Sequence, residues 1–412
     1  MVYGLQMNPT DQLSFENTEI AFRHSSDNDL KRAYWLFKVI NVNFLVKIGP
    51  PVTNFAVKIG LPIKGLIKAT IFRHFCGGET IRECEKTIQT LNAGHVGTIL
   101  DYSIEGEDDE QVFDNTCEEI IRTIRRAAKE PAIPITVFKP TGIARFTLLE
   151  KLDAKTPLTA EDELEWGKTK GRFLAICEKA HATGIPVMID AEETWIQDTI
   201  DQLALDMMRK FNKEKAIVYN TYQLYRHDKL QSLKNDHKIA AKEGFIMGAK
   251  LVRGAYMEKE RKRAAEMGYV SPIQPDKASS DRDYDAALDY CTDHIDQIAF
   301  VAGTHNEDSC RLLAELLDRK NIDHQNPHVY FSQLLGMSDN LSFNLADAKY
   351  NVAKYVPYGP IKAVLPYLFR RAQENTAIAG QMSRELSLIV KEMKRRSESR
   401  KVRKSGSPKG EI

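Results

Sequence analysis

The sequence predicts an α/β protein built as a (β/α)8 barrel, because two kinds of segment alternate regularly along it. Eight short apolar segments rich in β-forming residues are separated by longer, charged segments with helical periodicity. The apolar segments are Val96–Tyr102, Ile133–Lys139, Ile185–Asp190, Ala216–Gln223, Met247–Gly254, Ile298–Thr304, Val329–Leu334 and Val352–Pro357. Helical patterns include Asp114–Lys129, Glu161–Ala182 and Glu307–Arg319. Eight strands alternating with helices are typical of a closed parallel barrel.

The structural alternative is an open, doubly wound sheet. Such a sheet binds dinucleotides through a glycine-rich turn after its first strand. No G-x-G-x-x-G sequence follows Val96–Tyr102, which favours the barrel.

Composition excludes several classes of protein. The chain has 412 residues, of which 42% are hydrophobic and 28% charged, as is usual for a soluble globular protein. The net charge of +1 argues against a nucleic-acid-binding protein. The six cysteines form no CxxC pair and match no zinc-site spacing, so we expect reduced thiols and no metal site.

The two ends of the chain differ from its centre. We expect an N-terminal helical arm at 1–90, the barrel at 91–393 and a basic, disordered tail at 394–412. Residues 31–78 contain no Asp or Glu but many Lys, Arg and large apolar residues. This segment either packs on the barrel as a helical arm or touches an anionic membrane surface.

The N-terminus has no basic start and no apolar core, so it is not a signal peptide. Residues 31–78 are too interrupted by Lys and Pro to span a bilayer. We expect a protein of the bacterial cytoplasm that associates peripherally with the inner membrane.

Polar residues gather where the predicted strands end, which is where barrel enzymes carry their chemistry. They are Lys139, Asp190, Gln223, Arg253, Thr304, His305 and Tyr355. We expect Lys139 to pair with Asp190, and Arg253 with His305. Structural roles remain open: an ion pair closing the barrel, a capping Gln223, a buried His305, and a Gly254 that only turns the chain.

A late helical segment carries an unusual polar face. Tyr367, Arg370, Arg371 and Glu374 are spaced i, i+3, i+4 and i+7, so they share one side of a helix. Two adjacent guanidinium groups suit a small carboxylate. A solvent-exposed, salt-bridged helix face is the alternative.

Together these motifs resemble the proline dehydrogenase family. The resemblance rests on Lys139, Asp190-Ala-Glu-Glu193, Leu251-Val-Arg253-Gly-Ala-Tyr256, Thr304-His305-Asn306, Tyr355 and Tyr367-x-x-Arg-Arg-x-x-Glu-Asn375. It covers roughly 90–390, and Lys250–Tyr269 is closest to the eukaryotic-type branch. The resemblance implies a distorted (β/α)8 barrel whose final helix lies across the mouth.

The resemblance also implies a cofactor and a reaction. FAD would be held non-covalently without a dinucleotide fingerprint. L-Proline would lose a hydride from C5 to flavin N5, which yields Δ1-pyrroline-5-carboxylate, and the electrons would pass to a membrane quinone.

Site residues follow from the matching motifs. The resemblance implies catalytic roles for Asp190, Lys250 and Arg253. Substrate would be bound by Lys139, Leu334, Tyr355, Tyr367, Arg370 and Arg371, with both arginines clamping the carboxylate. The flavin would be held by Ala191, Gln223, Arg253, Gly254, Ala255, Thr304 and His305, and Glu374 would orient the arginines. Many bacterial members have Arg at position 250 and Lys at position 253, so the role of Lys250 is the uncertain one.

Three other functions remain open. Hydroxyproline dehydrogenase is the alternative most similar to proline dehydrogenase. Tyr355 nevertheless favours proline, because a smaller residue there would suit a hydroxylated ring. A Schiff-base aldolase could use Lys139. A membrane-docked binding protein would need no chemistry at all.

Overall fold

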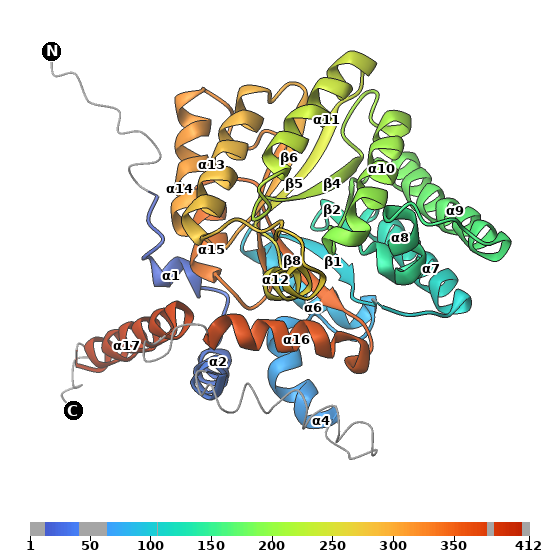
Figure 1. The fold of residues 1–412 in the computed structure, drawn as a ribbon. Coiled ribbons are helices and arrows are strands. Elements are labelled where there is room, and N and C mark those ends of the chain that lie inside the picture. The colour runs from blue at the N-terminus through green and yellow to red at the C-terminus, as the bar shows by residue number, and fades with distance from the viewer. Residues whose placement is uncertain (1–12, 41–63, 105, 377–382, 406–412) are drawn as a thin grey trace, which may run out of the picture.

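The computed structural model describes residues 13–40, 64–104, 106–376 and 383–405, and at its centre is a closed barrel of eight parallel strands (Figure 1). Each strand pairs with its neighbours in sequence, and β8 pairs with β1 to close the barrel. The predicted (β/α)8 fold and all eight strands are confirmed. The strands are β1 (Gly97–Tyr102), β2 (Ile135–Phe138), β3 (Val187–Ile189), β4 (Val218–Gln223), β5 (Met247–Val252), β6 (Ile298–Gly303), β7 (Val329–Leu334) and β8 (Val352–Tyr358).

Alternate residues of the strands form two separate cores, because side chains on a strand point to opposite faces. One set packs inside the barrel and includes Ile99, Val137, Met188 and Ala353. The other set packs outward against the helices. This alternation also decides which strand-end side chains turn into the barrel mouth.

Helices cover the outside of the barrel between successive strands (Figure 1). They are α7 (Glu110–Ala127), α8 (Phe146–Asp153), α9 (Ala160–Thr183), α10 (Thr194–Phe211), α11 (Lys229–Glu243), α13 (Lys277–Asp293), α14 (Glu307–Arg319) and α15 (Asp339–Asp347), with the 3-10 turn η3 (Pro140–Gly142). The additional helix α12 (Met257–Met267) bonds instead to Glu150 of α8 and to Glu193 and Thr194 at the start of α10. Helix α6 (Ile81–Ala93) precedes the barrel and contacts both β1 and β8. It therefore occupies the place where a helix following β8 would otherwise pack.

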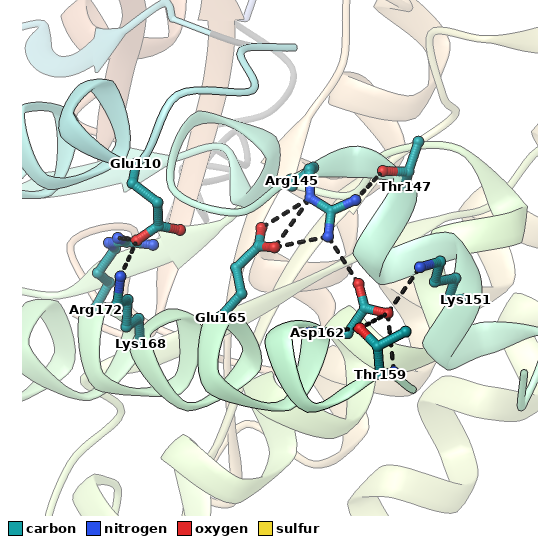
Figure 2. Close-up of polar contacts among 9 residues, drawn as sticks. All are labelled: Glu110, Arg145, Thr147, Lys151, Thr159, Asp162, Glu165, Lys168 and Arg172. Carbon is teal, nitrogen blue, oxygen red and sulfur yellow. Dashed lines mark hydrogen bonds and ion pairs between the residues drawn. The ribbon is translucent and has the colours of Figure 1, made fainter. Parts of the chain in front are cut away.

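A network of ion pairs fixes the start of α9 (Figure 2). Thr159 and Asp162 form a capping box, in which each side chain accepts a hydrogen bond from the other residue's backbone N–H. Asp162 also contacts Arg145 at 2.9 Å and Lys151 at 2.7 Å, while Arg145 bonds to Glu165. We call Arg145, Lys151, Asp162 and Glu165 the α8–α9 network.

The helix that follows β8, α16 (Ile361–Thr376), does not join the outer ring. It packs against the N-terminal arm, which consists of α1 (Thr18–Ala21), α2 (Asp27–Ile40), α4 (Lys64–Ile67), the π-helical η2 (Lys68–Phe72) and α5 (Arg73–Phe75). Apolar residues of the arm and α16 form a third core with α17 (Arg384–Ser405). Pro366 lies inside α16, so this helix begins earlier than the motif around Tyr367 indicates.

The expectation of a disordered tail is wrong for residues 394–405. They belong to α17, which packs against α2, and so α16 is not the final helix (Figure 1). Leu388 and Ile389 anchor the first half of α17 in this third core. Arg396 bonds to Glu392 on its own helix and to Asp27 of α2. The sequence alone predicts solvated basic residues here because Asp27, the partner of Arg396, is distant in sequence. Residues 406–412 lie outside the described residues.

No helix in the described part of the chain is long and apolar enough to cross a membrane. In those same ranges, no group of His, Cys, Asp and Glu side chains is arranged to hold a metal ion. Part of the expected membrane-contacting segment, residues 41–63, lies outside the described residues.

Candidate active site

Five side chains at the carboxyl ends of the strands form a buried charged cluster, which we call the rim network: Asp101, Lys139, Asp190, Lys250 and Tyr355. Asp101, Lys139 and Asp190 each follow an inward-facing core residue by two positions (Ile99, Val137 and Met188). The strand period of two therefore turns all three into the barrel mouth.

Asp190 is the centre of one half of the rim network. One carboxylate oxygen accepts a hydrogen bond from Lys250 Nζ at 2.6 Å, and the other accepts from the Tyr355 hydroxyl at 2.5 Å. The Lys250 ammonium also lies 4.8 Å from the centre of the Tyr355 ring. Lys250 thus reaches from β5 to the end of β3 and lies against two other expected site residues, Asp190 and Tyr355.

Asp101 and Lys139 form the other half. Lys139 Nζ donates to Asp101 Oδ2 at 2.9 Å, and the Asp101 side chain is fully buried. The expected ion pair between Lys139 and Asp190 is replaced by two pairs, Lys139–Asp101 and Lys250–Asp190. Asp101 was missed because a single acid near the end of an apolar strand gives no motif.

Charges in the rim network hold its groups in fixed protonation states. Burial raises the pKa of Asp190, but the ammonium groups of Lys250 and Lys139 outweigh it and leave that pKa below its usual value. Burial, followed by the charges of Asp101 and Asp190, raises the pKa of Tyr355 well above its usual value. Asp190 is therefore a carboxylate and Tyr355 a neutral phenol across the ordinary pH range.

The residues expected to hold flavin lie on the neighbouring sector of the rim, from β4 to β6. Arg253 stacks over the Tyr284 ring and bonds to Asp281 at 2.7 Å, Thr304 at 2.9 Å and Ser309 at 2.9 Å. Its ion-pair partner is thus Asp281 of α13, and the expected pairing with His305 is wrong. Arg253 follows the outward-facing Leu251 by two positions, which directs it toward the helices.

Gln223 is the clearest buried acceptor in this sector. Its side-chain amide nitrogen donates to the Glu192 carbonyl at 2.9 Å. Its carbonyl oxygen is buried and has no hydrogen-bond partner among the described residues. Buried acceptors are nearly always bonded, so this oxygen fits a site completed by a ligand donor.

Gly254 and Ala255 follow Arg253 and are exposed beside it, whereas Ala191 is partly buried. Gly254 has φ +135°, and a Cβ there would lie 2.4 Å from the Tyr225 ring. Packing against Tyr225 is therefore sufficient to require glycine at this position.

His305 is partly buried and neutral. Burial lowers its pKa to about 3, assisted by the positive charges of Lys354 and Arg371. Its Nδ1 lies 2.8 Å from Ser338 Oγ, and its Nε2 faces the Leu334 backbone N–H at 3.4 Å.

Helix α16 brings the predicted carboxylate-binding face to the rim. Tyr367 and Arg371 are buried, and the Arg371 guanidinium lies 5.1 Å from the Tyr367 ring centre. Tyr367 raises the pKa of Tyr355 and Arg371 lowers the pKa of His305, so this face lies within electrostatic reach of both sectors of the rim. Arg370 is partly buried on the same helix, whereas the side chain of Glu374 lies outside the described part.

Comparison with known proteins places this chain in a family. Residues 84–384 match the family model described as proline dehydrogenase. The chain belongs to the proline dehydrogenase family. The predicted family is thereby confirmed.

Similar proteins come from eukaryotes and bacteria. Proline dehydrogenase 1, mitochondrial, of Dictyostelium discoideum is 34% identical and covers 92% of this chain and 74% of its own. The human protein of that name is 42% identical over 58% of this chain and 40% of its own. The carbapenem antibiotics biosynthesis protein CarD of Pectobacterium carotovorum is 34% identical over 78% of this chain and 83% of its own.

Solved structures share the fold. Proline utilization A (PutA) from Bdellovibrio bacteriovorus superposes with a TM-score of 0.68 over 90% of this chain, at 18% identity. The chain spans 39% of that much longer protein. This likeness concerns the fold alone.

Proposed function

We propose that this chain is an FAD-dependent L-proline dehydrogenase that produces Δ1-pyrroline-5-carboxylate, the first step of proline catabolism to glutamate. The observation that carries the proposal is the rim network, a buried set of charges beneath the Tyr367–Arg371 face of α16. Buried charges cost free energy, and proteins retain them chiefly where function needs them.

The protein's own residues would bind and orient the substrate. Arg370 and Arg371 would hold the proline carboxylate from α16, and Lys139 would reach it from the barrel. Asp190 would orient the amine end and, with Tyr355, shape the pocket around the ring. Leu334 and Tyr367 would pack against that ring. Fixed charges at both ends of a small zwitterion position its reacting carbon without a covalent step.

The β4–β6 sector fits a flavin. The unsatisfied oxygen of Gln223 offers an acceptor for a ring N–H, while Arg253 and Thr304 offer polar contacts beside it. His305, Gly254, Ala255 and the backbone of Ala191 would complete the cofactor site. Bound FAD would accept the hydride from C5 of proline at N5. No G-x-G-x-x-G sequence follows the first strand of this chain, so the flavin would depend on these side chains.

We also propose that electrons pass to a membrane quinone and that the arm contacts the membrane. Trp35, Val39 and Leu66 are 60%, 51% and 67% exposed, and they surround a cavity of about 640 Å³ between the arm and α16. Lys31, Arg32 and Arg73 also line it, with Asp29 as the acidic exception. An apolar face bordered by cations suits an anionic bilayer surface.

Co-flotation with anionic liposomes tests the membrane contact. The double variant Trp35→Gln/Leu66→Gln should lose flotation and quinone reduction while keeping its reaction with a soluble acceptor. Full quinone activity of this variant in liposomes would rule out the contact.

One experiment tests the central proposal. The purified, FAD-loaded protein should be yellow, and anaerobic L-proline should bleach its flavin absorbance. A flavoprotein that proline leaves oxidised would refute the substrate. A higher kcat/KM for trans-4-hydroxyproline than for proline would instead support hydroxyproline dehydrogenase.

The aldolase alternative is less compatible with the rim. A Schiff base requires an uncharged lysine amine, whereas Lys139 is paired with the buried carboxylate of Asp101. A colourless protein with aldol activity would revive that alternative.

A further inference from the structure

The loop after β7 (335–338) is held in a strained conformation beside the site. Gly336 has φ +77° and Ser338 has φ +51°, both in the left-handed region. For a serine this conformation is unfavourable and persists only where neighbouring groups impose it.

Four separate elements impose it. His74 of the arm contacts the Gly336 carbonyl at 2.9 Å, and Lys354 of β8 donates to the Met337 carbonyl. His305, after β6, contacts the Ser338 hydroxyl at 2.8 Å. Glu385 of α17 accepts the Ser338 backbone N–H at 2.5 Å. A helix outside the barrel therefore reaches a residue that touches the flavin sector.

The Ser338 side chain does not cap the helix that follows it. Ser338 precedes α15 at the N-cap position, where serine normally accepts a backbone N–H of the first turn. Its side chain makes no such bond. Instead, its hydroxyl is directed at His305.

The contacts define the state of His305. Its Nε2 faces the Leu334 N–H and must accept, so the proton lies on Nδ1 and is donated to Ser338 Oγ. On the other side of this residue, the Glu385 carboxyl group accepts the Ser338 backbone N–H. Ser338 thus links the His305 imidazole, through its hydroxyl, to the Glu385 carboxyl group, through its backbone N–H.

We propose that Glu385 is a positioning residue, which fixes the orientation and tautomer of His305 through Ser338 and so couples docking of α17 to flavin binding. This inference rests on the proposed function for its flavin. Glu385 lies one residue beyond the part that matches the family model, residues 84–384. It acts through Ser338 and touches no reacting atom.

The groups around Glu385 allow its protonation state to change near neutral pH. Burial raises its pKa to about 7, the backbone bond to Ser338 lowers it, and Asp339 and Lys354 act in opposite directions. Asp339 and Lys354 also influence the pKa of His74 on the arm, in opposite directions. Near neutral pH, Glu385 therefore exchanges between a carboxylate and a weaker-accepting carboxylic acid.

The test compares Glu385→Ala, Glu385→Gln and Ser338→Ala with Glu398→Gln, a control on the exposed face of the same helix. Hydrogen exchange of the cofactor-free protein reports on the Leu334 and Ser338 amides. FAD titration at several pH values reports on the flavin sector. Glu385→Ala and Ser338→Ala should each weaken FAD binding on the order of tenfold, the usual scale for losing a charge-assisted bond behind a ligand.

In addition, Glu385→Ala should accelerate local exchange on the order of tenfold, because the Ser338 amide loses its acceptor. Glu385→Gln, which keeps an acceptor, should stay within about threefold of wild type and lose the pH dependence of FAD affinity near pH 7. Glu398→Gln should match wild type throughout.

Wild-type exchange and wild-type FAD affinity in Glu385→Ala would overturn the proposal. If that variant fails to fold, unchanged FAD affinity in Ser338→Ala would overturn it equally. Should wild type bind no FAD, the proposed function fails, while the exchange data still decide whether Glu385 holds the loop.

Discussion

The rim network and the α8–α9 network contain the same kinds of ion pair in two different settings. Lys250 and Asp101 in the rim have side chains that are 11% and 0% exposed, whereas Arg145 and Lys151 are 24% and 38% exposed. The Arg145–Asp162 and Lys151–Asp162 bonds join residues 17 and 11 positions apart. In the rim, the Lys250–Asp190 and Tyr355–Asp190 bonds span 60 and 165 positions.

This difference separates charges that support the fold from charges that serve the site. The α8–α9 network caps a helix and forms among residues already close in the chain (Figure 2). The rim network forms only when the barrel closes, and it removes four charges from water. Such a cluster stabilises little, because the loss of hydration offsets the attraction between the charges. We therefore expect opposite responses when each is altered.

The largest effect should come from the arginine face above the rim. Arg371→Lys keeps the charge but loses the planar pair of donors that matches a carboxylate. We expect kcat/KM for L-proline to fall on the order of 100-fold, mainly through KM. Steady-state kinetics measure it, with Arg125→Lys on the exposed face of α7 as the matched control. An unchanged KM for proline in Arg371→Lys would contradict the clamp.

Substitutions in the rim network should lower activity strongly. They should lower stability only when they leave one buried charge without its partner. Asp190→Asn leaves Lys250 without its carboxylate, and we expect unfolding free energy to fall by about 3 kcal/mol. The double variant Asp190→Asn/Lys250→Met should recover part of this loss, since no buried charge is left alone. Activity should fall on the order of 10- to 100-fold in both. Denaturant unfolding and proline kinetics measure the two effects. Greater instability of the double variant would show that the pair supports the fold.

A third effect is the dependence of flavin reduction on pH. The neutral proline amine is the better hydride donor, so the rate should rise by up to about tenfold per pH unit as the amine loses its proton. The depressed pKa of Asp190, the raised pKa of Tyr355 and a His305 pKa of about 3 leave these groups unchanged in that window. The carboxylate of Asp190 contributes stability above its unfolded pKa, and this is lost only in acid. Stopped-flow absorbance between about pH 6 and pH 9 measures the rate of flavin reduction. A rate that does not change with pH would contradict hydride transfer from the neutral amine.

The smallest effect on catalysis should come from the α8–α9 network. Arg145→Ala removes bonds to Asp162 and Glu165 at a partly exposed position. We expect the unfolding free energy to fall by about 1 kcal/mol, because solvent screens such pairs. Proline kcat/KM should stay within about twofold, since Arg145 has no part in positioning the substrate. A large loss of activity at unchanged stability would remove the contrast between the two networks.

The sequence by itself determined the barrel and most of the residues at its rim. Strand and helix periods are local properties, so eight strands could be recognised and the polar residues at their ends identified. The spacing of Tyr367, Arg370 and Arg371 likewise predicted a shared helix face. Family motifs then added the expectation of flavin and proline.

Tertiary structure alone decided how these residues are paired. Strand order in space places β1 beside β2, so Lys139 meets Asp101, while Lys250 reaches across the mouth to Asp190. It also folded the basic C-terminal segment into α17 by supplying Asp27, and carried Glu385 to Ser338. Partners separated by tens or hundreds of residues leave no periodic trace in the chain, because their contact depends on closure of the barrel and on packing of the two ends against it.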